Sequence, residues 1–197
     1  MIEVDDRDPV RDYTEEELHR LTEQLRKVTW AIAAGDYRAS HFDLALILRF
    51  HAALFDGVRG HAGRHRRPGF GSEYLTFGPQ RSVHRDKVDA ELAVVVQGVQ
   101  RGLRQLLDDP DSSDYEHGAL RLAVGAHAEI IRIHPFEDGN GRTSRLCADH
   151  ILVQCGLWPV PIEAVKQEYT TALNYYYQAG DIGPLLDLFI ALYLVER

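Results

Sequence analysis

The sequence predicts an all-α fold with one small β-hairpin. Helix starts and stops recur along the chain: Thr14 and Glu17 form a capping box, and Gly35 and Gly57 each end a run of apolar residues at helical spacing. The stretch 59–83 differs from the rest, because it is rich in Gly, Pro and Arg and holds one short apolar segment, EYLTF. We expect a long loop with a hairpin there.

The same signals set the order of the helices. The central segment, GALRLAVGAHAEIIRI, confines its charges to one narrow strip, so we expect it to be the buried centre of a bundle. Pro135 disfavours the α conformation at His134, so this helix should end there. Pro184 suits the first turn of the last helix. In order, the expected helices cover about 15–34, Ser40 to Gly57, 87–107, 118–133, 142–155, 167–179 and 184 onward.

Composition fits a single folded domain that spans 1–197, because a chain of this length can bury roughly 70% of its unfolded surface. Thirty acidic and 22 basic residues give a net charge of -8, which argues against nucleic-acid binding through bulk charge. No segment approaches the ~20 apolar residues of a membrane span. The N-terminus also lacks an apolar run, so we expect a cytoplasmic protein without membrane contact. Cys147 and Cys155 would lie about 12 Å apart on one helix, too far for a disulfide.

The segment HPFEDGNGRTSR carries the candidate chemistry. Backbone N–H groups at Gly139, Asn140 and Gly141 precede a helix and, with the helix dipole, form a site for an anion such as a phosphate. Arg142 and Arg145 lie three residues apart, so both guanidinium groups can face the same anion. Two positive charges at a helix start oppose the helix dipole, and a bound polyphosphate would resolve that conflict.

Two more side chains of this segment suit phosphate chemistry. Asp138 fits a hard cation such as Mg²⁺, which takes one or two carboxylates plus phosphate oxygens. His134 fits a general base, since imidazole titrates near neutral pH. Other motifs fail on spacing: the P-loop pattern is absent, Ser144 replaces the third glycine of GxGxxG, and Arg142 and Thr143 break an EF-hand pattern. The sequence therefore predicts a phosphate cradle with a base and a metal site.

The same segment matches the Fic motif, HxFx[D/E]GNGRxxR, at every specified position, so the chain resembles the Fic/Doc superfamily. FHAALFDGVRGHAGRHR is similar to the part that precedes the family's flap hairpin, GALRLAVGAHAEIIRI to its central helix, and YTTALNYYYQAGDIGPLLDLF to its downstream helices. The resemblance covers a core of about 40–190, with the helix at about 15–34 before it. It implies a Fic-fold helical bundle with a β-hairpin flap.

The resemblance also implies a protein adenylyltransferase, which transfers AMP from ATP to a Ser, Thr or Tyr hydroxyl of a target protein. His134 would accept the proton, Phe136 would anchor the loop in the core, and Asp138 would hold Mg²⁺. The nucleotide would be bound by Gly139, Asn140, Gly141, Arg142 and Arg145. Both arginines would bind the β and γ phosphates. The flap, which pairs with the target by strand addition, would comprise Gly71, Ser72, Glu73, Tyr74, Leu75, Thr76 and Phe77.

The chain departs from the family pattern at two places. His61 stands where many members have the Trp of Trp-Ala-Gly, which alters a supporting residue. The autoinhibitory motif [S/T]xxxE[G/N], whose glutamate pairs with the arginine at position 145, has no good copy here. Inhibition is therefore expected from a separate antitoxin-like partner or a homo-oligomer. Transfer of another nucleotide or of phosphocholine stays open, as does a catalytically silent nucleotide-binding module. A Doc-like kinase is disfavoured by Gly139 and Arg142.

Other residues invite weaker hypotheses. His127 is expected to be a packed residue, and the arginines of 59–67 a solvated or target-docking patch. The consecutive tyrosines 175–177 point in three directions, so one of them can line an adenine pocket, but ordinary packing is the expected role of each. The histidines form no HxH or HExxH pattern, so no zinc site is expected.

Overall fold

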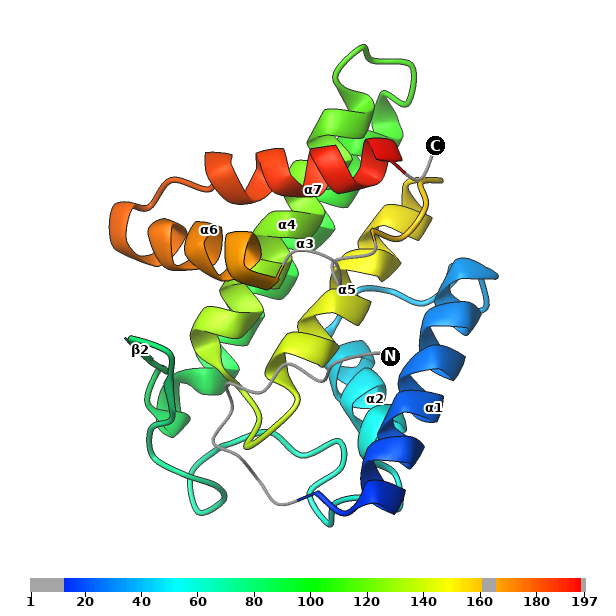
Figure 1. Ribbon diagram of the computed structural model, residues 1–197. Helices are drawn as coiled ribbons and strands as arrows, with labels where there is room; N and C mark the ends of the chain where they lie inside the picture. The colour runs from blue at the N-terminus through cyan, green and yellow to red at the C-terminus, as the bar shows by residue number, and fades with distance from the viewer. Residues whose placement is uncertain (1–12, 161–165, 196–197) are drawn as a thin grey trace.

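The computed structural model describes residues 13–160 and 166–195, and these form the predicted helical bundle with one small hairpin (Figure 1). Its α-helices are α1 (Glu15–Ala33), α2 (Leu44–Phe55), α3 (Val88–Asp108), α4 (Tyr115–Ile133), α5 (Asn140–Gln154), α6 (Lys166–Ala179) and α7 (Gly183–Val195). A hairpin of β1 (Thr76–Phe77) and β2 (Gln80–Arg81), followed by the 3-10 helix η1 (Arg85–Lys87), lies between α2 and α3.

Helices α4 and α5 form the centre of the bundle and share its most extensive helix–helix contact. Helices α1 and α2 pack against α5, while α3 and α7 pack against α4, and α6 packs against α7. Most of the circumference of α4 is buried, and its exposed strip holds Arg121, as its charge pattern predicts. The loop that joins α4 to α5 is thus supported by helices on both sides.

Local signals explain most helix ends, with three corrections. Thr14 and Glu17 form the expected capping box of α1. Helix α2 begins at Leu44 instead of after Ser40, because the Asp43 carboxylate caps it by accepting a hydrogen bond from the Leu46 N–H. Helix α4 begins three residues before the predicted Gly118, and helix α5 begins two residues before the predicted start.

The hairpin is shorter and later than EYLTF predicts. Its antiparallel register pairs Thr76 with Arg81 and Phe77 with Gln80, so Glu73 to Leu75 lie outside the strands. The Leu75 N–H donates to the Ser82 side chain instead of continuing the ladder. Most of this segment therefore precedes the first strand, and only its last two residues belong to the hairpin.

One cluster of buried apolar residues runs through the bundle and draws on all seven helices of the described chain. Cys147 and Cys155 are both free and buried, as predicted. Burial raises the pKa of both thiols. None of the helices in the described ranges is long and apolar enough to cross a membrane.

Candidate active site

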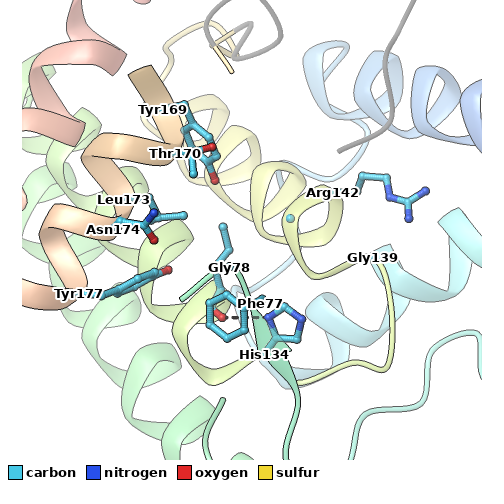
Figure 2. Close-up of a pocket in the computed structure, with 12 residues that line it drawn as sticks. Phe77, Gly78, His134, Gly139, Arg142, Tyr169, Thr170, Leu173, Asn174 and Tyr177 are labelled. Carbon is cyan, nitrogen blue, oxygen red and sulfur yellow. Dashed lines mark hydrogen bonds between the residues drawn. The ribbon is translucent and has the colours of Figure 1, made fainter. Parts of the chain in front are cut away.

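His134 lies at the C-terminus of α4, where the chain turns out of the helix (Figure 2). Its φ of 53° is left-handed, and it is the one non-glycine residue with positive φ among the described residues. Such a conformation is costly for a residue with a side chain and persists only where the surroundings enforce it, most often at functional sites. The turn places the ring, which is almost fully buried, against the hairpin.

The His134 ring has two identified contacts. Nδ1 lies 3.3 Å from the carbonyl oxygen of Ile131, and because a carbonyl only accepts, Nδ1 carries the proton. The neutral ring then has Nε2 as its basic nitrogen. The Phe77 ring of the hairpin stacks on the imidazole with centroids 4.2 Å apart. The candidate base and the hairpin are therefore in direct contact.

Phe136 anchors the loop in the core, where it is fully buried. Its N–H donates to the Asn140 side chain at 2.8 Å, and the Asn140 amide donates back to the Phe136 carbonyl at 2.9 Å. The Phe136 ring stacks on the His51 ring at 3.8 Å. The Asn140 side chain thus fixes the loop conformation, which leaves the backbone N–H of Asn140 to bind an anion.

His51 is a supporting residue that the sequence analysis missed. Its Nδ1 accepts from the Gly63 N–H at 2.9 Å, which leaves Nε2–H to donate to the Asp138 carbonyl at 3.1 Å. Burial lowers the pKa of His51 to about 3, so the ring is neutral and this donor pattern is fixed. A histidine within an apolar helix gives no sequence signal for such a contact.

The start of α5 leaves its first backbone N–H groups without a side-chain cap. Gly139 is the N-cap, with φ of 77°, and no side chain caps the helix. A Cβ at Gly139 would lie 2.3 Å from Phe55, so the backbone approaches that ring more closely than any other residue type permits. Backbone N–H groups and the helix dipole together provide positive potential at this end.

The charged residues of the loop take different partners. Asp138 and Arg142 are both buried and form an ion pair at 3.1 Å. The Arg145 Nε donates to the Gly141 carbonyl at 3.2 Å, and its charge reaches His127 and Asp149. The two arginines, which were predicted to face one anion, therefore point to different neighbours in this structure.

A cavity lies between the hairpin, the start of α5 and α6 (Figure 2). It brings together five of the predicted residues, from the loop and from the flap, while Asp138, Asn140 and Arg145 do not line it. Its α6 wall was not predicted, since ordinary packing was the expected role of each tyrosine of 175–177, and Tyr177 in fact lines the cavity. The lining residues include Phe77, His134, Gly139, Gly141, Arg142, Tyr169, Thr170, Leu173, Asn174 and Tyr177.

His127 is a packed residue, as predicted. It is fully buried, and its Nε2 lies 2.7 Å from the Tyr169 hydroxyl. Burial lowers the pKa of His127 to about 3, and the charge of Arg145 acts in the same direction. This neutral histidine supports the α6 wall of the cavity.

Arg66 contradicts the prediction of a solvated arginine patch. Its side chain is fully buried, and its five N–H groups make six hydrogen-bond contacts, all to backbone carbonyls, so one N–H of Nη2 is shared. Two of them reach His134, at 2.9 and 2.7 Å, and two reach Ser72 and Glu73 in the predicted flap. Glu137 also joins the loop after α4 to the predicted flap, because its carboxylate accepts from both the N–H and the hydroxyl of Ser72.

The sequence profile of the Fic/DOC family matches residues 41–152, which is more than half of the chain. The chain is 44% identical over 69 residues to the Protein adenylyltransferase Fic of Culex quinquefasciatus, a match that covers 34% of this chain and 13% of that protein. It is 28% identical over 159 residues to the protein of the same name from Drosophila mojavensis, covering 79% of this chain and 30% of that protein. It is also 33% identical over 81 residues to the ribonucleoside-diphosphate reductase small chain of Ostreid herpesvirus 1, a match that covers 41% of this chain and 13% of that protein.

The chain spans less than a third of the length of these three relatives.

Solved structures agree on the fold. The BepC protein of Bartonella tribocorum, with bound AMPPNP, superposes with a TM-score of 0.68 at 20% identity, over 90% of this chain and 86% of that one. The N-terminal FIC domain of Bep8 from Bartonella sp. 1-1C superposes with a TM-score of 0.72 at 16% identity, over 93% of this chain and 88% of that one.

Proposed function

The chain belongs to the Fic/DOC family, and from that premise we propose that it is a protein adenylyltransferase, which transfers AMP from ATP to a hydroxyl side chain of a target protein. The observation that carries the proposal is the pairing of a left-handed turn at His134 with the uncapped start of α5, on either side of one cavity. A base and an anion site thus face the same space. The relatives named as adenylyltransferases supply the reaction class.

In the proposed reaction, Nε2 of His134 accepts the proton of the target hydroxyl as its oxygen attacks the α-phosphorus of ATP. The bond between the α-phosphorus and the oxygen that bridges to the β-phosphorus breaks, and pyrophosphate leaves. The Ile131 carbonyl keeps the imidazole in the required tautomer by accepting from Nδ1. The N–H groups at Gly139 and Gly141 stabilise the negative charge of the phosphates.

Asp138 fits the magnesium ion that the family implies. Its carboxylate is buried at the loop, and one such ligand suffices for Mg²⁺ when phosphate oxygens and water complete the shell. Among the described residues, no cluster of three or more His, Cys, Asp or Glu could hold a metal. The ion would supply charge neutralisation for the phosphates. In this structure Arg142, which would contact the phosphates, pairs with Oδ1 of Asp138.

Tyr177 and Asn174 suit the base and sugar end of the nucleotide, since both line the cavity on α6. The Tyr177 hydroxyl donates to the Ala128 carbonyl at 3.0 Å, which fixes the ring as a wall. Arg145 would contact the leaving phosphates after a change of rotamer. Because the sequence holds no good copy of the family's autoinhibitory motif, a separate antitoxin-like chain or a homo-oligomer is the proposed source of inhibition.

Labelling tests the proposal directly. The protein, Mg²⁺ and α-labelled ATP are incubated with a cell lysate, and label on proteins is measured. His134→Ala should lower labelling by roughly 10²–10⁴-fold, the usual contribution of a general base. The matched control is His41→Ala, which removes an exposed histidine and should leave labelling unchanged.

Labelling of equal strength by wild type and His134→Ala would refute the role of His134. Mass spectrometry of the labelled proteins identifies the transferred group, so an added mass other than AMP would identify another nucleotide or phosphocholine as the donor fragment. A rise in melting temperature with ATP, without any transfer, would instead indicate a silent nucleotide-binding module.

A further inference from the structure

The segment that carries the hairpin is basic, although the chain is acidic as a whole. The segment 59–87 contains seven Arg or Lys residues and two acidic residues, whereas the whole chain has 22 basic and 30 acidic residues. Two of the seven are used inside the fold: Arg66 is buried against backbone carbonyls, and Arg59 pairs with Glu17 of α1 at 2.5 Å. Of the other arginines, Arg64, Arg67 and Arg81 are exposed and Arg85 is half-buried.

These remaining arginines lie along one stretch, residues 70–74, that leads into the hairpin. The Arg64 guanidinium lies 3.8 Å above the centre of the Phe70 ring. Arg85 donates to the Gly71 carbonyl at 2.9 Å, and the Arg81 guanidinium lies 3.6 Å above the Tyr74 ring. In addition, Arg67 exchanges backbone hydrogen bonds with Phe70. The positive charges therefore all lie next to the segment 70–74, which leads into β1.

Three of these charges are not neutralised. Arg64, Arg67 and Arg81 are exposed, and within the described residues none forms an ion pair. By contrast, Arg85 has weak pairs with Glu73 and Asp86, at 3.7 and 3.8 Å. Stacking on Phe70 and Tyr74 orders two of the side chains without removing their charge. We call Arg64, Arg67 and Arg81 the basic rim.

The basic rim is close to the proposed site of transfer but is separate from the nucleotide site. Arg81 pairs in register with Thr76, and the next residue, Phe77, stacks on His134. None of the three rim arginines lines the cavity between α5 and α6. A macromolecule that brings a hydroxyl to His134 along the hairpin would therefore pass the rim, whereas the nucleotide would not need it.

We propose that the basic rim binds an acidic segment of the target protein, next to the residue that is modified. This proposal rests on the proposed function, because it assigns the rim to the acceptor side of that reaction. Complementary charges raise the rate and specificity of encounter at such surfaces. An acidic protein segment is favoured over nucleic acid, since the net charge of the chain is -8 and the rim follows no nucleic-acid-binding motif.

Peptide binding tests the rim without requiring transfer. Fluorescent peptides of about twelve residues, long enough to extend along the hairpin and rim, would be made from Asp, Glu and Ser, from Gln and Ser, and from Lys and Ser. Anisotropy should show that the acidic peptide binds at least about tenfold more tightly than the neutral one, with affinity falling as salt rises. The basic peptide should bind most weakly.

The variant with Arg64→Gln, Arg67→Gln and Arg81→Gln should lose that preference. A matched control changes three exposed arginines of α3 and α4, Arg101→Gln, Arg104→Gln and Arg121→Gln, which alters net charge equally and should retain it. The shift in melting temperature on addition of ATP should be the same in all three proteins, which verifies that the fold and the nucleotide site persist.

Equal loss in the control variant, or equal binding of acidic and neutral peptides, would overturn the proposal. Tighter binding of a single-stranded RNA of similar length than of the acidic peptide, lost in the rim variant, would overturn it in favour of nucleic acid. The proposed function can fail separately: absence of any transfer, with acidic binding at the rim intact, would reject the reaction and leave the rim as a docking surface.

Discussion

Arg66 lies between the stretch before the hairpin and the end of α4, and it joins the two through backbone carbonyls alone. Its donors reach Ile133 and His134 on one side and Ser72, Glu73 and Val83 on the other. Burial lowers the pKa of the guanidinium, and the carboxylate of Glu137 opposes that shift. Because the left-handed turn at His134 needs external support, these bonds are its structural basis.

Replacing Arg66 by Met should therefore destabilise the protein by about 3–5 kcal/mol, because buried carbonyls lose a charged donor. Urea unfolding measures this loss. The neighbouring change Arg67→Met removes an exposed side chain and should stay within about 0.5 kcal/mol of wild type. Arg66→Lys keeps the charge without the planar fork, so it should restore only part of the stability and of the labelling activity. Similar losses for the Arg66→Met and Arg67→Met variants would contradict the assignment.

The difference between buried Arg66 and exposed Arg67 could not be predicted from the sequence. The arginines of 59–67 look alike in sequence, yet one is a buried support and the others are exposed or paired at the surface. The difference arises from carbonyls as distant in sequence as His134, which no local spacing encodes. The role of His51 was missed for the same reason, since its partner Asp138 lies on another element.

At the scale of elements, the connection from α4 to α5 was predictable because its determinants are local. Pro135 ends α4, and the glycines allow the left-handed entry to α5. The hairpin was placed less well, since two-residue strands carry no periodicity and contacts of Ser82 and Arg66 decide where pairing begins. The α6 wall of the cavity depends on how separate helices pack, so the sequence alone did not predict which residues form it.

Gly139→Ala should disrupt the α4–α5 connection. The left-handed φ of 77° costs roughly 1–2 kcal/mol for alanine, and the added Cβ would press into the Phe55 ring, so the start of α5 must shift. We expect weaker ATP binding, by about tenfold or more, measured by calorimetry, together with lower labelling. Gly98→Ala on α3 is the matched control, because a Cβ there meets nothing within 4 Å. It should leave ATP binding unchanged and raise stability by about 0.5–1 kcal/mol. Unchanged ATP affinity in the Gly139→Ala variant would contradict a nucleotide site at this turn.

At the scale of the whole molecule, buried titrating groups set the response of stability to pH. Burial lowers the pKa of His51 and of His127 to about 3 and that of His150 to about 4. In the unfolded chain these histidines bind protons near pH 6.5. Their contribution to stability is therefore complete above about pH 6.5 and is lost as the pH falls toward the folded values. Asp149 has the opposite sign, since burial raises its pKa to about 7 and its contribution is lost as the pH rises through that value.

Between about pH 6 and pH 4.5, three histidines favour the unfolded state on acidification and one carboxyl opposes them. The net excess of about two protons predicts that the free energy of unfolding falls by roughly 2–3 kcal/mol per pH unit. Urea unfolding across this range measures the slope. His150→Gln removes one of the three histidines, which packs against Phe42 and Phe50 away from the cavity, and should reduce the slope by about 1 kcal/mol per pH unit. A stability that stays constant or rises on acidification would mean that the buried histidines bind protons in the folded state, and would contradict their packing as neutral rings.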